Sequence, residues 1–309
     1  MPPGIINPIS DSTLHQARKP TWIKVRLPSN PVFVSTKGLI ADLKLHTVCE
    51  SAQCPNRWEC WSRGTATFMI AGDRCTRACR FCAVSTAKPL PLEEDEPERV
   101  AEAVRRMKLK HVVLTAVARD DLKDGGASHF AHVVQAVRAI DSSLVVEVLT
   151  PDFNGREWAL QIVLDANPHV FNHNLETVER LTPFVRSRAK YRLSLEVLSM
   201  AKRLRASLVV KSGLMLGLGE AEAELLQAMD DLLETGVQVL TLGQYLRPSP
   251  RHFPVVEYIP PAIFDRYRDI ALSKGFEFVS SGPLVRSSYH AADFVPLTVP
   301  NSPKKASSG

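Results

Sequence analysis

Six cysteines, arranged as two triplets, are the residues of this chain most able to support unusual chemistry. All six lie between Cys49 and Cys82, and none follows in the rest of the 309 residues. The second triplet, Cys75, Cys79 and Cys82, has the spacing C-x3-C-x2-C. Three thiolates cannot complete a tetrahedral zinc site without a fourth ligand. They can hold three irons of a [4Fe–4S] cluster and leave the fourth iron open.

The setting of the cysteines favours metal ligation over disulfide formation. Residues 1–19 have neither the apolar core of a secretion signal nor the Arg- and Ser-rich bias of a transit peptide. The chain also lacks the run of about 18 apolar residues that predicts a membrane span. We therefore expect a cytoplasmic protein, whose thiols stay reduced and bind metal.

The first triplet, Cys49, Cys54 and Cys60, has the spacing C-x4-C-x5-C and lies ahead of any regular pattern. His46 stands three positions before Cys49. These four residues therefore also match a Cys3His zinc site, and spacing alone leaves that alternative open.

The elements that must position these cysteines alternate along the chain. Apolar, strand-like segments are followed by amphipathic, helix-like ones, which is typical of a parallel sheet covered by helices. Six such units are fewer than the eight of a complete barrel, so we predict an α/β fold with a partial (β/α)6 barrel of the TIM type. The six units pair strands at 65–71, 111–117, 144–149, 169–172, 208–215 and 237–242 with helices at 94–107, 127–140, 155–165, in segments up to about 204, at 221–233 and at 262–274; a last short strand is predicted at 276–279.

Three regions follow from this pattern. Residues 1–64 form an N-terminal extension that carries the first triplet, 65–280 form the barrel, and 281–309 form a C-terminal segment. Residues 1–40 are rich in proline, which removes a helical hydrogen bond, and we expect them to be irregular. The second triplet directly follows the first barrel strand, in a loop that would belong to the active-site face.

The composition and the net charge of the chain are compatible with several kinds of binding partner. Charged residues make up 23% of the chain and the formal net charge is +5. This mild excess suits an acidic partner surface, nucleic acid, or simply a solvated surface. No paired carboxylates, Ser-His-Asp order or phosphate-binding loop indicates a hydrolase or a nucleotidase.

Together with the cysteines, five further blocks resemble lipoyl synthase, a family of the radical S-adenosylmethionine (SAM) superfamily. The C-x3-C-x2-C spacing, with Phe81 before the last cysteine, resembles the superfamily signature. The resemblance runs from about Lys19 to Ala292. The blocks are TAVARDDL at 115–122, FNHNLET at 171–177, KSGLMLGLGE at 211–220, GQYL at 243–246 and GPLVRSSYHA at 282–291.

The resemblance implies an enzyme that inserts sulfur at C6 and C8 of an octanoyl chain held on a protein lysine. One cluster would reduce SAM, and each resulting 5′-deoxyadenosyl radical would open one C–H bond. An auxiliary [4Fe–4S] cluster would donate the sulfur. The implied ligands are Cys75, Cys79 and Cys82 for the first cluster, and Cys49, Cys54, Cys60 and Ser287, with Ser288 as the neighbouring alternative, for the second.

The resemblance also implies partners. The substrate would be an octanoylated lipoyl carrier domain, from a 2-oxoacid dehydrogenase E2 subunit or a glycine cleavage H protein. A ferredoxin or flavodoxin would donate electrons, and an iron–sulfur carrier protein would rebuild the auxiliary cluster. No membrane or nucleic acid is expected. The alternatives are another dual-cluster radical SAM enzyme that inserts sulfur, a non-catalytic iron–sulfur electron carrier, or a zinc-stabilised scaffold.

Polar residues near the predicted strand ends are further candidates. Arg119 and Asp120 follow the second strand and are expected to act near SAM and substrate. Lys211 lies inside an apolar strand, where a lysine without a partner is costly, so we expect it to project toward SAM or substrate unless it reaches outward to solvent. The candidates for SAM binding are Asn172, Asn174, Gly217, Gln244 and Tyr245. Arg77 and Arg80 lie between cluster ligands, where they are expected to lower thiolate pKa values.

Overall fold

The computed structural model describes residues 19–23, 31–63, 66–141, 143–289 and 291. Its centre is an eight-stranded sheet in the order β1-β2-β5-β6-β7-β8-β9-β10, in which every neighbouring pair is parallel except β1 with β2. The strands are β1 (His46–Thr47), β2 (Thr67–Ile70), β5 (His111–Ala116), β6 (Val145–Leu149), β7 (Val170–Asn172), β8 (Val209–Leu216), β9 (Val239–Gln244) and β10 (Phe278–Gly282). A separate pair is formed by β3 (Arg74–Cys75) and β4 (Ser85–Thr86).

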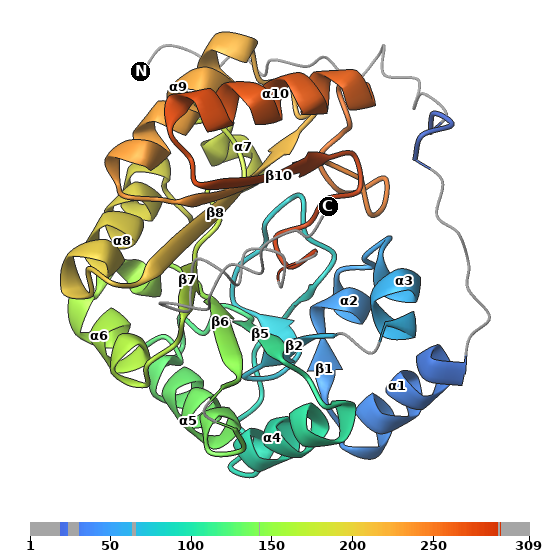
Figure 1. The fold of residues 1–309 in the computed structure, drawn as a ribbon, viewed down its shortest axis with the longest axis vertical. Helices are drawn as coiled ribbons and strands as arrows, with labels where there is room; N and C mark the ends of the chain where they lie inside the picture. The colour runs from blue at the N-terminus through green and yellow to red at the C-terminus, as the bar shows by residue number, and fades with distance from the viewer. Residues whose placement is uncertain (1–18, 24–30, 64–65, 142, 290, 292–309) are drawn as a thin grey trace, which may run out of the picture.

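Helices cover the outside of this curved sheet (Figure 1). The first and last strands of the order are not paired with each other in the described residues, so the barrel stays open, as predicted. The outer helices are α4 (Glu96–Met107), α5 (Ala127–Arg138), α6 (Glu157–Asp165), α8 (Tyr191–Leu204), α9 (Glu222–Glu234) and α10 (Pro261–Lys274). Two short helices, η1 (Phe153–Gly155) and α7 (Thr182–Val185), lie in loops.

Helix α4 illustrates why these residues form these elements. Val100, Ala103 and Val104 recur at helical spacing and are buried. Acidic residues occupy its first turn and basic residues its last, which suits the helix dipole. The sheet strands, by contrast, are apolar on both faces because side chains fill the barrel on one side and helices cover the other.

The N-terminal region contains helices where we expected irregular chain. Helix α1 (Pro31–Asp42) begins at Pro31, a position where proline costs no helical hydrogen bond, and no proline follows before residue 55. Phe33 of α1 stacks on Trp58 of α3 (Arg57–Ser62) at 4.6 Å between ring centroids. With α2 (Val48–Ser51), these helices hold the first cysteine triplet. The expectation of irregular chain was therefore wrong for residues 31–40; the predicted boundary at 64 and the tail 301–309 lie outside the described residues.

The segment after β10 turns back into the barrel. The hydroxyl of Thr67, the first residue of β2, donates a hydrogen bond to the Ser288 hydroxyl at 2.8 Å. Ala291 joins a buried cluster of inward-facing valines from the amino-terminal halves of the strands, namely Val113, Val170, Val209 and Val239. Ser288 and Ala291 therefore lie inside the barrel.

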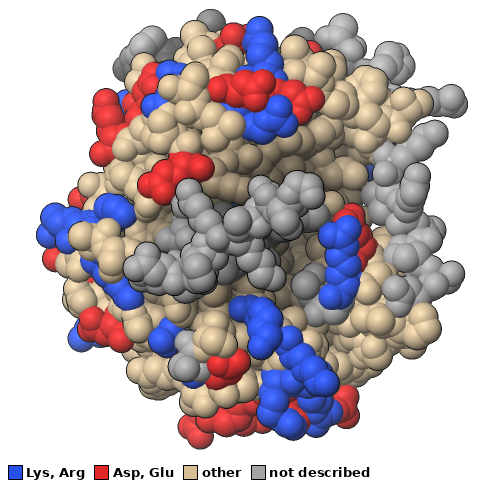
Figure 2. Space-filling model, in the orientation of Figure 1, with Lys and Arg blue, Asp and Glu red and all other residues tan. Residues whose placement is uncertain are grey.

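Charged side chains of both signs are intermixed over the outer helices (Figure 2). Several are paired locally, as where Glu102 meets Arg105 at 2.7 Å and Arg106 at 2.6 Å. The charges within such a pair cancel. The formal net charge of +5 comes from the excess of Lys and Arg over Asp and Glu. None of the helices that the structure describes is long and apolar enough to cross a membrane.

Candidate active site

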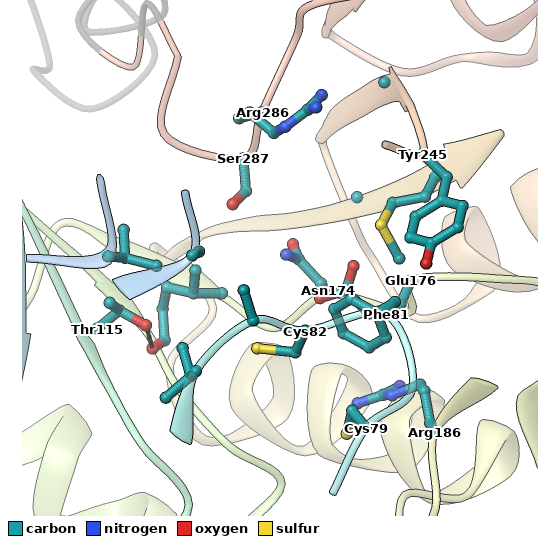
Figure 3. A pocket seen from close by; sticks show the side chains of 18 of the residues that line it. Cys79, Phe81, Cys82, Thr115, Asn174, Glu176, Arg186, Tyr245, Arg286 and Ser287 are labelled. Atoms are coloured by element: carbon teal, nitrogen blue, oxygen red, sulfur yellow. Dashed lines mark hydrogen bonds between the residues drawn. The ribbon is translucent and has the colours of Figure 1, made fainter. Parts of the chain in front are cut away.

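A cavity of about 590 Å³ occupies the carboxyl end of the barrel. Its floor consists of inward-facing strand residues that the sheet register sets side by side, such as Met69 beside Thr115 and Met215 beside Gly243. Its walls come from the loops that follow the strands and from the C-terminal segment (Figure 3). The strand-end loops thus meet at one site, as a barrel fold predicts.

The loop that carries the second cysteine triplet follows β2 and forms one wall of the cavity. The pairing of β3 with β4 closes its base, and the Cys82 amide donates to the carbonyl of Cys79 at 3.1 Å. Cys75, Cys79 and Cys82 all line the cavity. We call residues 75–82 the cluster loop.

The cluster loop suits an iron–sulfur cluster better than a single ion. Nowhere in the described ranges do three His, Cys, Asp or Glu side chains converge closely enough to hold one metal ion. In a [4Fe–4S] cluster each thiolate binds a different iron, so its ligands need not meet at one point. Burial raises the pKa of the Cys82 thiol to about 12 and also raises that of Cys79. Metal coordination, which requires the thiolate form, would offset this effect of burial.

Arg77 fastens the cluster loop to two strand ends. Its guanidinium donates to both carboxylate oxygens of Asp152 at 2.7 Å and to Asp120 at 2.8 and 2.9 Å. This contact lowers the pKa of Asp120 to about 2. Arg77 was expected to lower thiolate pKa values; it lines the cavity and acts in that direction on Cys79, although burial outweighs it. Asp120 was expected to act near SAM and substrate, but its side chain pairs with Arg77 and is absent from the cavity lining.

Arg119 is likewise used within the protein. It is buried, donates to the carbonyl of Ala71 at 3.0 Å and pairs with Asp121 at 2.9 Å. It therefore joins the ends of β2 and β5 and does not line the cavity. Arg119 was expected to act near SAM and substrate. Its guanidinium instead bonds the Ala71 carbonyl and the Asp121 carboxylate, away from the cavity.

Lys211 lies beneath the cavity floor, in a buried charged group. Its side chain is 1% exposed, and its Nζ lies 2.9 and 3.2 Å from the two carboxylate oxygens of Glu147. Asn172 donates to the same carboxylate at 3.0 Å. Burial alone would raise the pKa of Glu147, but Lys211 and His111 outweigh burial and lower it to about 2. Lys211 and Asn172 thus face Glu147 rather than SAM, and neither lines the cavity.

We expect the Lys211→Met substitution to destabilise the fold by about 3–5 kcal/mol, because it leaves the Glu147 carboxylate buried without its main cation. Combining it with Glu147→Gln should recover part of that loss. Denaturant unfolding of the two variants measures both effects. Near-wild-type stability with impaired SAM binding would instead support the catalytic role that the sequence predicts for Lys211.

Asn174 and Glu176 project into the cavity from the loop after β7 (Figure 3). The Oδ1 atom of Asn174 is buried and has no hydrogen-bond partner among the described residues. Glu176 has a φ of +70°, a conformation that costs energy for a residue other than glycine. Backbone hydrogen bonds to Gly213 and Met215, at 2.9 and 2.8 Å, hold it there. Such strain, maintained by neighbours, is typical of a functional position.

Glu176 was not singled out from the sequence, although it lies within the FNHNLET block. Burial raises its pKa, while the guanidinium of Arg186 acts in the opposite direction. Arg186 and Arg286 also line the cavity and face this one carboxylate. The buried charges of the cavity are therefore net positive, which suits ligands that carry negative charge, such as thiolate-bound clusters and a carboxylate.

Of the remaining residues predicted to bind SAM, two line the cavity and one does not. Gln244 and Tyr245 line it. The amide of Gln244 is already bonded to backbone groups, including the carbonyl of Glu257 at 2.9 Å and the amide of Ile259 at 2.8 Å. The Tyr245 hydroxyl donates to the carbonyl of Phe253 at 2.7 Å. Gly217 lies outside the cavity lining, and its φ of +91° with the Glu257 carbonyl alongside explains the need for glycine.

His173, the first residue after β7, predicts that the free energy of unfolding depends on pH. Its ring nitrogens bond the Thr150 carbonyl at 2.8 Å and the Ser194 hydroxyl at 3.0 Å. Burial, and then Arg186, lower its pKa from 6.5 to about 4. Below pH 6.5, His173 therefore binds a proton in the unfolded chain but not in the folded protein. As a result, the free energy of unfolding falls by up to about 3 kcal/mol toward pH 4. Urea unfolding of wild type and His173→Asn across this interval should show a smaller pH dependence in the variant; equal slopes would contradict this account.

The first cysteine triplet lies beside the cavity. Cys49 is buried, and burial raises the pKa of its thiol to about 11. Burial also raises the pKa of Cys54, and the nearby Arg286 partly offsets this effect. The residues next to these cysteines, including Val48 and Pro55, line the cavity. Within the described ranges, His46 and the triplet do not converge on a single metal position.

Three contacts fasten the C-terminal segment to this N-terminal region. Asn56 donates to the carbonyl of Leu284 at 2.6 Å, and the Tyr289 hydroxyl lies 3.1 Å from Glu59. The third is the bond between Ser288 and Thr67. Ser287, between these anchors, presents its side chain to the cavity, across from Cys82 and Asn174 (Figure 3).

Comparison with known proteins agrees with this architecture. A family model described as the radical SAM superfamily matches residues 69–232. Similar folds include methylornithine synthase (PylB), with a TM-score of 0.54 and 14% identity over 79% of this chain and 81% of that one. Another is Streptococcus suis SuiB, with a TM-score of 0.55 and 8% identity over 80% of this chain and 57% of that one. The fold and the cluster loop therefore define a radical SAM enzyme, which uses a [4Fe–4S] cluster and SAM.

Relatives of higher sequence identity show to which family within this superfamily the chain belongs. Lipoyl synthase of Shouchella clausii is 53% identical over 93% of this chain and 94% of the relative. Lipoyl synthase of Parabacteroides distasonis is 54% identical over 89% of this chain and 97% of the relative. The chain belongs to the lipoyl synthase family. It is accordingly a radical SAM sulfurtransferase, and the non-catalytic alternatives that the sequence left open are excluded.

Proposed function

We propose that this enzyme inserts two sulfur atoms, at C6 and C8, into an octanoyl chain linked to a carrier-domain lysine, and so forms lipoyl-lysine. The observation that carries the proposal is a single cavity bordered both by Cys75, Cys79 and Cys82 and by Ser287. A substrate chain in that cavity has the radical source on one side and the sulfur source on the other. The function of the lipoyl synthase relatives supports the same reaction.

Cys75, Cys79 and Cys82 hold the cluster that reduces SAM in this proposal. The bound cofactor supplies one 5′-deoxyadenosyl radical for each C–H bond that is opened. Asn174 has a free carbonyl oxygen in the cavity, and Glu176 offers a carboxylate beside it, so both are suited to accept hydrogen bonds from ribose hydroxyls. Tyr245 and Gln244 contribute the wall against which the adenine packs.

Cys49, Cys54, Cys60 and Ser287 hold the auxiliary cluster that is consumed as the sulfur donor. The choice of Ser287 over Ser288 is supported by their surroundings, since Ser287 lines the cavity and Ser288 is bonded to Thr67. A serine oxygen is a harder ligand than thiolate and suits the iron of a cluster less well. Ser287 would therefore hold its iron less firmly than a cysteine would, which suits a cluster that gives up sulfur.

Apolar side chains make the cavity suited to an octanoyl chain. Met69, Leu149 and Met215 come from the barrel floor, and Phe81 and Val285 come from the walls. They exclude water from a reactive carbon and hold an unbranched alkyl chain without polar contacts. The carrier domain, an E2 lipoyl domain or an H protein, remains outside and inserts only its lysine arm.

The remaining partners follow from the chemistry. A ferredoxin or flavodoxin supplies electrons, and an iron–sulfur carrier protein rebuilds the auxiliary cluster after each turnover. We also infer a cytoplasmic location, because the cluster-binding thiols stay reduced there.

The decisive experiment is anaerobic incubation of the reconstituted enzyme with an octanoyl-lysyl peptide, SAM and reductant, followed by mass spectrometry. The expected product gains two sulfur atoms and loses two hydrogens. Omission of SAM is the matched control and should leave the peptide unchanged. Formation of 5′-deoxyadenosine without any sulfur in the peptide would indicate a different dual-cluster reaction and would overturn the proposal.

A further inference from the structure

Two chain segments contact the backbone of the cluster loop directly. The Arg80 amide donates to the carbonyl of Val185 at 2.8 Å, and the Phe253 amide donates to the carbonyl of Arg80 at 2.7 Å. His252 lies 3.0 Å from the carbonyl of Cys82. Residues 182–190 and 245–256 therefore flank the cluster loop directly.

These segments carry an unbalanced positive charge. Neither 182–190 nor 245–256 contains an aspartate or glutamate. Arg188 approaches one carboxylate, Asp120, at 4.0 Å, but Asp120 already pairs with Arg77. We call the five cations of this surface the basic rim: Arg80, Arg188, Lys190, Arg247 and Arg251. Their summed charge of +5 equals the formal net charge of the whole chain, so the remaining residues balance each other.

The basic rim lies beside the cluster loop and next to the cavity wall, to which Ala189 and Pro248 belong. Phe81 lines the cavity, whereas its neighbour Arg80 is exposed and stacks on Phe253 at 5.3 Å from the ring centre. Of the five rim residues, only Arg247 also belongs to the cavity lining. A protein docked on the rim would thus approach the cluster from outside without entering the substrate site.

We propose that the basic rim is the docking surface for an acidic one-electron donor protein of the flavodoxin or ferredoxin class. The inference rests on the proposed function, which consumes one electron for each SAM cleavage. In each docking event the donor is oxidised by one electron and the cluster of Cys75, Cys79 and Cys82 is reduced by one. In the proposed function the carrier domain inserts its lysine arm into the cavity, and a donor on the rim would reach the same cluster without entering that cavity. Complementary charge would speed this encounter.

The test compares the double variant Arg188→Glu/Arg251→Glu with wild type. Both residues are exposed and neither lines the cavity. Formation of 5′-deoxyadenosine is measured with an acidic flavodoxin hydroquinone and, separately, with dithionite. We expect the ratio of flavodoxin-driven to dithionite-driven rate to fall at least about tenfold at about 50 mM salt, and the difference from wild type to shrink at about 500 mM. Binding of oxidised flavodoxin, measured by calorimetry, should weaken in parallel.

The matched control is Lys37→Glu/Lys110→Glu, which changes the net charge equally on helix α1 and at the amino end of β5, where the Lys110 side chain is 83% exposed. It should preserve the ratio. An unchanged ratio in the rim variant, or an equal loss with both reductants, would overturn the proposal. So would a selective rise in KM for the octanoylated carrier domain, since the rim would then serve the substrate protein. Because 5′-deoxyadenosine is read directly, failure to form lipoyl groups is a separate result.

Discussion

Replacement of Cys82 by alanine is expected to reduce 5′-deoxyadenosine formation to background while the auxiliary cluster remains bound. Cys82 is one of the three cavity-lining cysteines of the cluster loop, and two thiolates cannot hold a cubane that also presents an open iron to SAM. Iron content should fall from roughly eight to roughly four atoms per chain in anaerobically reconstituted protein. Chromatography of the nucleoside product, together with iron analysis, measures both effects.

The Cys54→Ala variant is the matched control for Cys82→Ala. It removes a thiol from the other triplet, so it should also lose about four irons. In contrast to Cys82→Ala, it should still cleave SAM and should fail only in sulfur transfer. SAM cleavage at wild-type rate by the Cys82→Ala variant would show that the cluster loop is not the site of radical formation.

The Ser287→Cys substitution is expected to keep the auxiliary cluster bound but to lower lipoyl formation at least about tenfold. Thiolate is a softer ligand than serine oxygen and should hold the iron that must leave for sulfur to be transferred. Lipoyl-peptide yield is measured by mass spectrometry, and cluster content by iron and sulfide analysis. SAM cleavage should continue, since the cluster loop is unchanged.

The neighbouring Ser288→Cys variant tests whether position, rather than the presence of an extra thiol, decides this result. Ser288 is bonded to Thr67 and does not line the cavity. Its loss should cost about 1 kcal/mol of stability, typical of one hydrogen bond, with little effect on sulfur transfer. Full lipoyl formation by Ser287→Cys, with failure of Ser288→Cys, would assign the ligand to Ser288 instead.

The barrel could be predicted because its signals are local. The strand predicted at 111–117 corresponds to β5 (His111–Ala116), and the helix predicted at 262–274 corresponds to α10 (Pro261–Lys274). Helix α1 was not predicted because the density of prolines indicated irregular chain, whereas Pro31 occupies the first helical position, where proline is favourable.

The candidate site was predicted unevenly, and the reason is where each side chain finds its partner. The cluster-loop cysteines could be recognised because their spacing is short and their role depends on residue type. Lys211 and Asp120 could not be assigned from sequence, since Glu147 and Arg77, which satisfy their charges, lie 64 and 43 positions away in the chain. Glu176 was missed because its functional signal is a strained backbone angle rather than a residue pattern.

Residue types and local spacing were enough to recognise the two cysteine triplets, the alternation of strands and helices, and hence the family and its chemistry. The folded chain was needed to show that Ser288 and Ala291 lie inside the barrel, that Ser287 rather than Ser288 faces the cavity, and that cations from the cluster loop and its two flanking segments lie close together. The physical reason is the range of the interactions involved. Ligand spacing and hydrophobic periodicity act over a few residues, whereas ion pairs and cavity walls join residues that only the folded chain brings together.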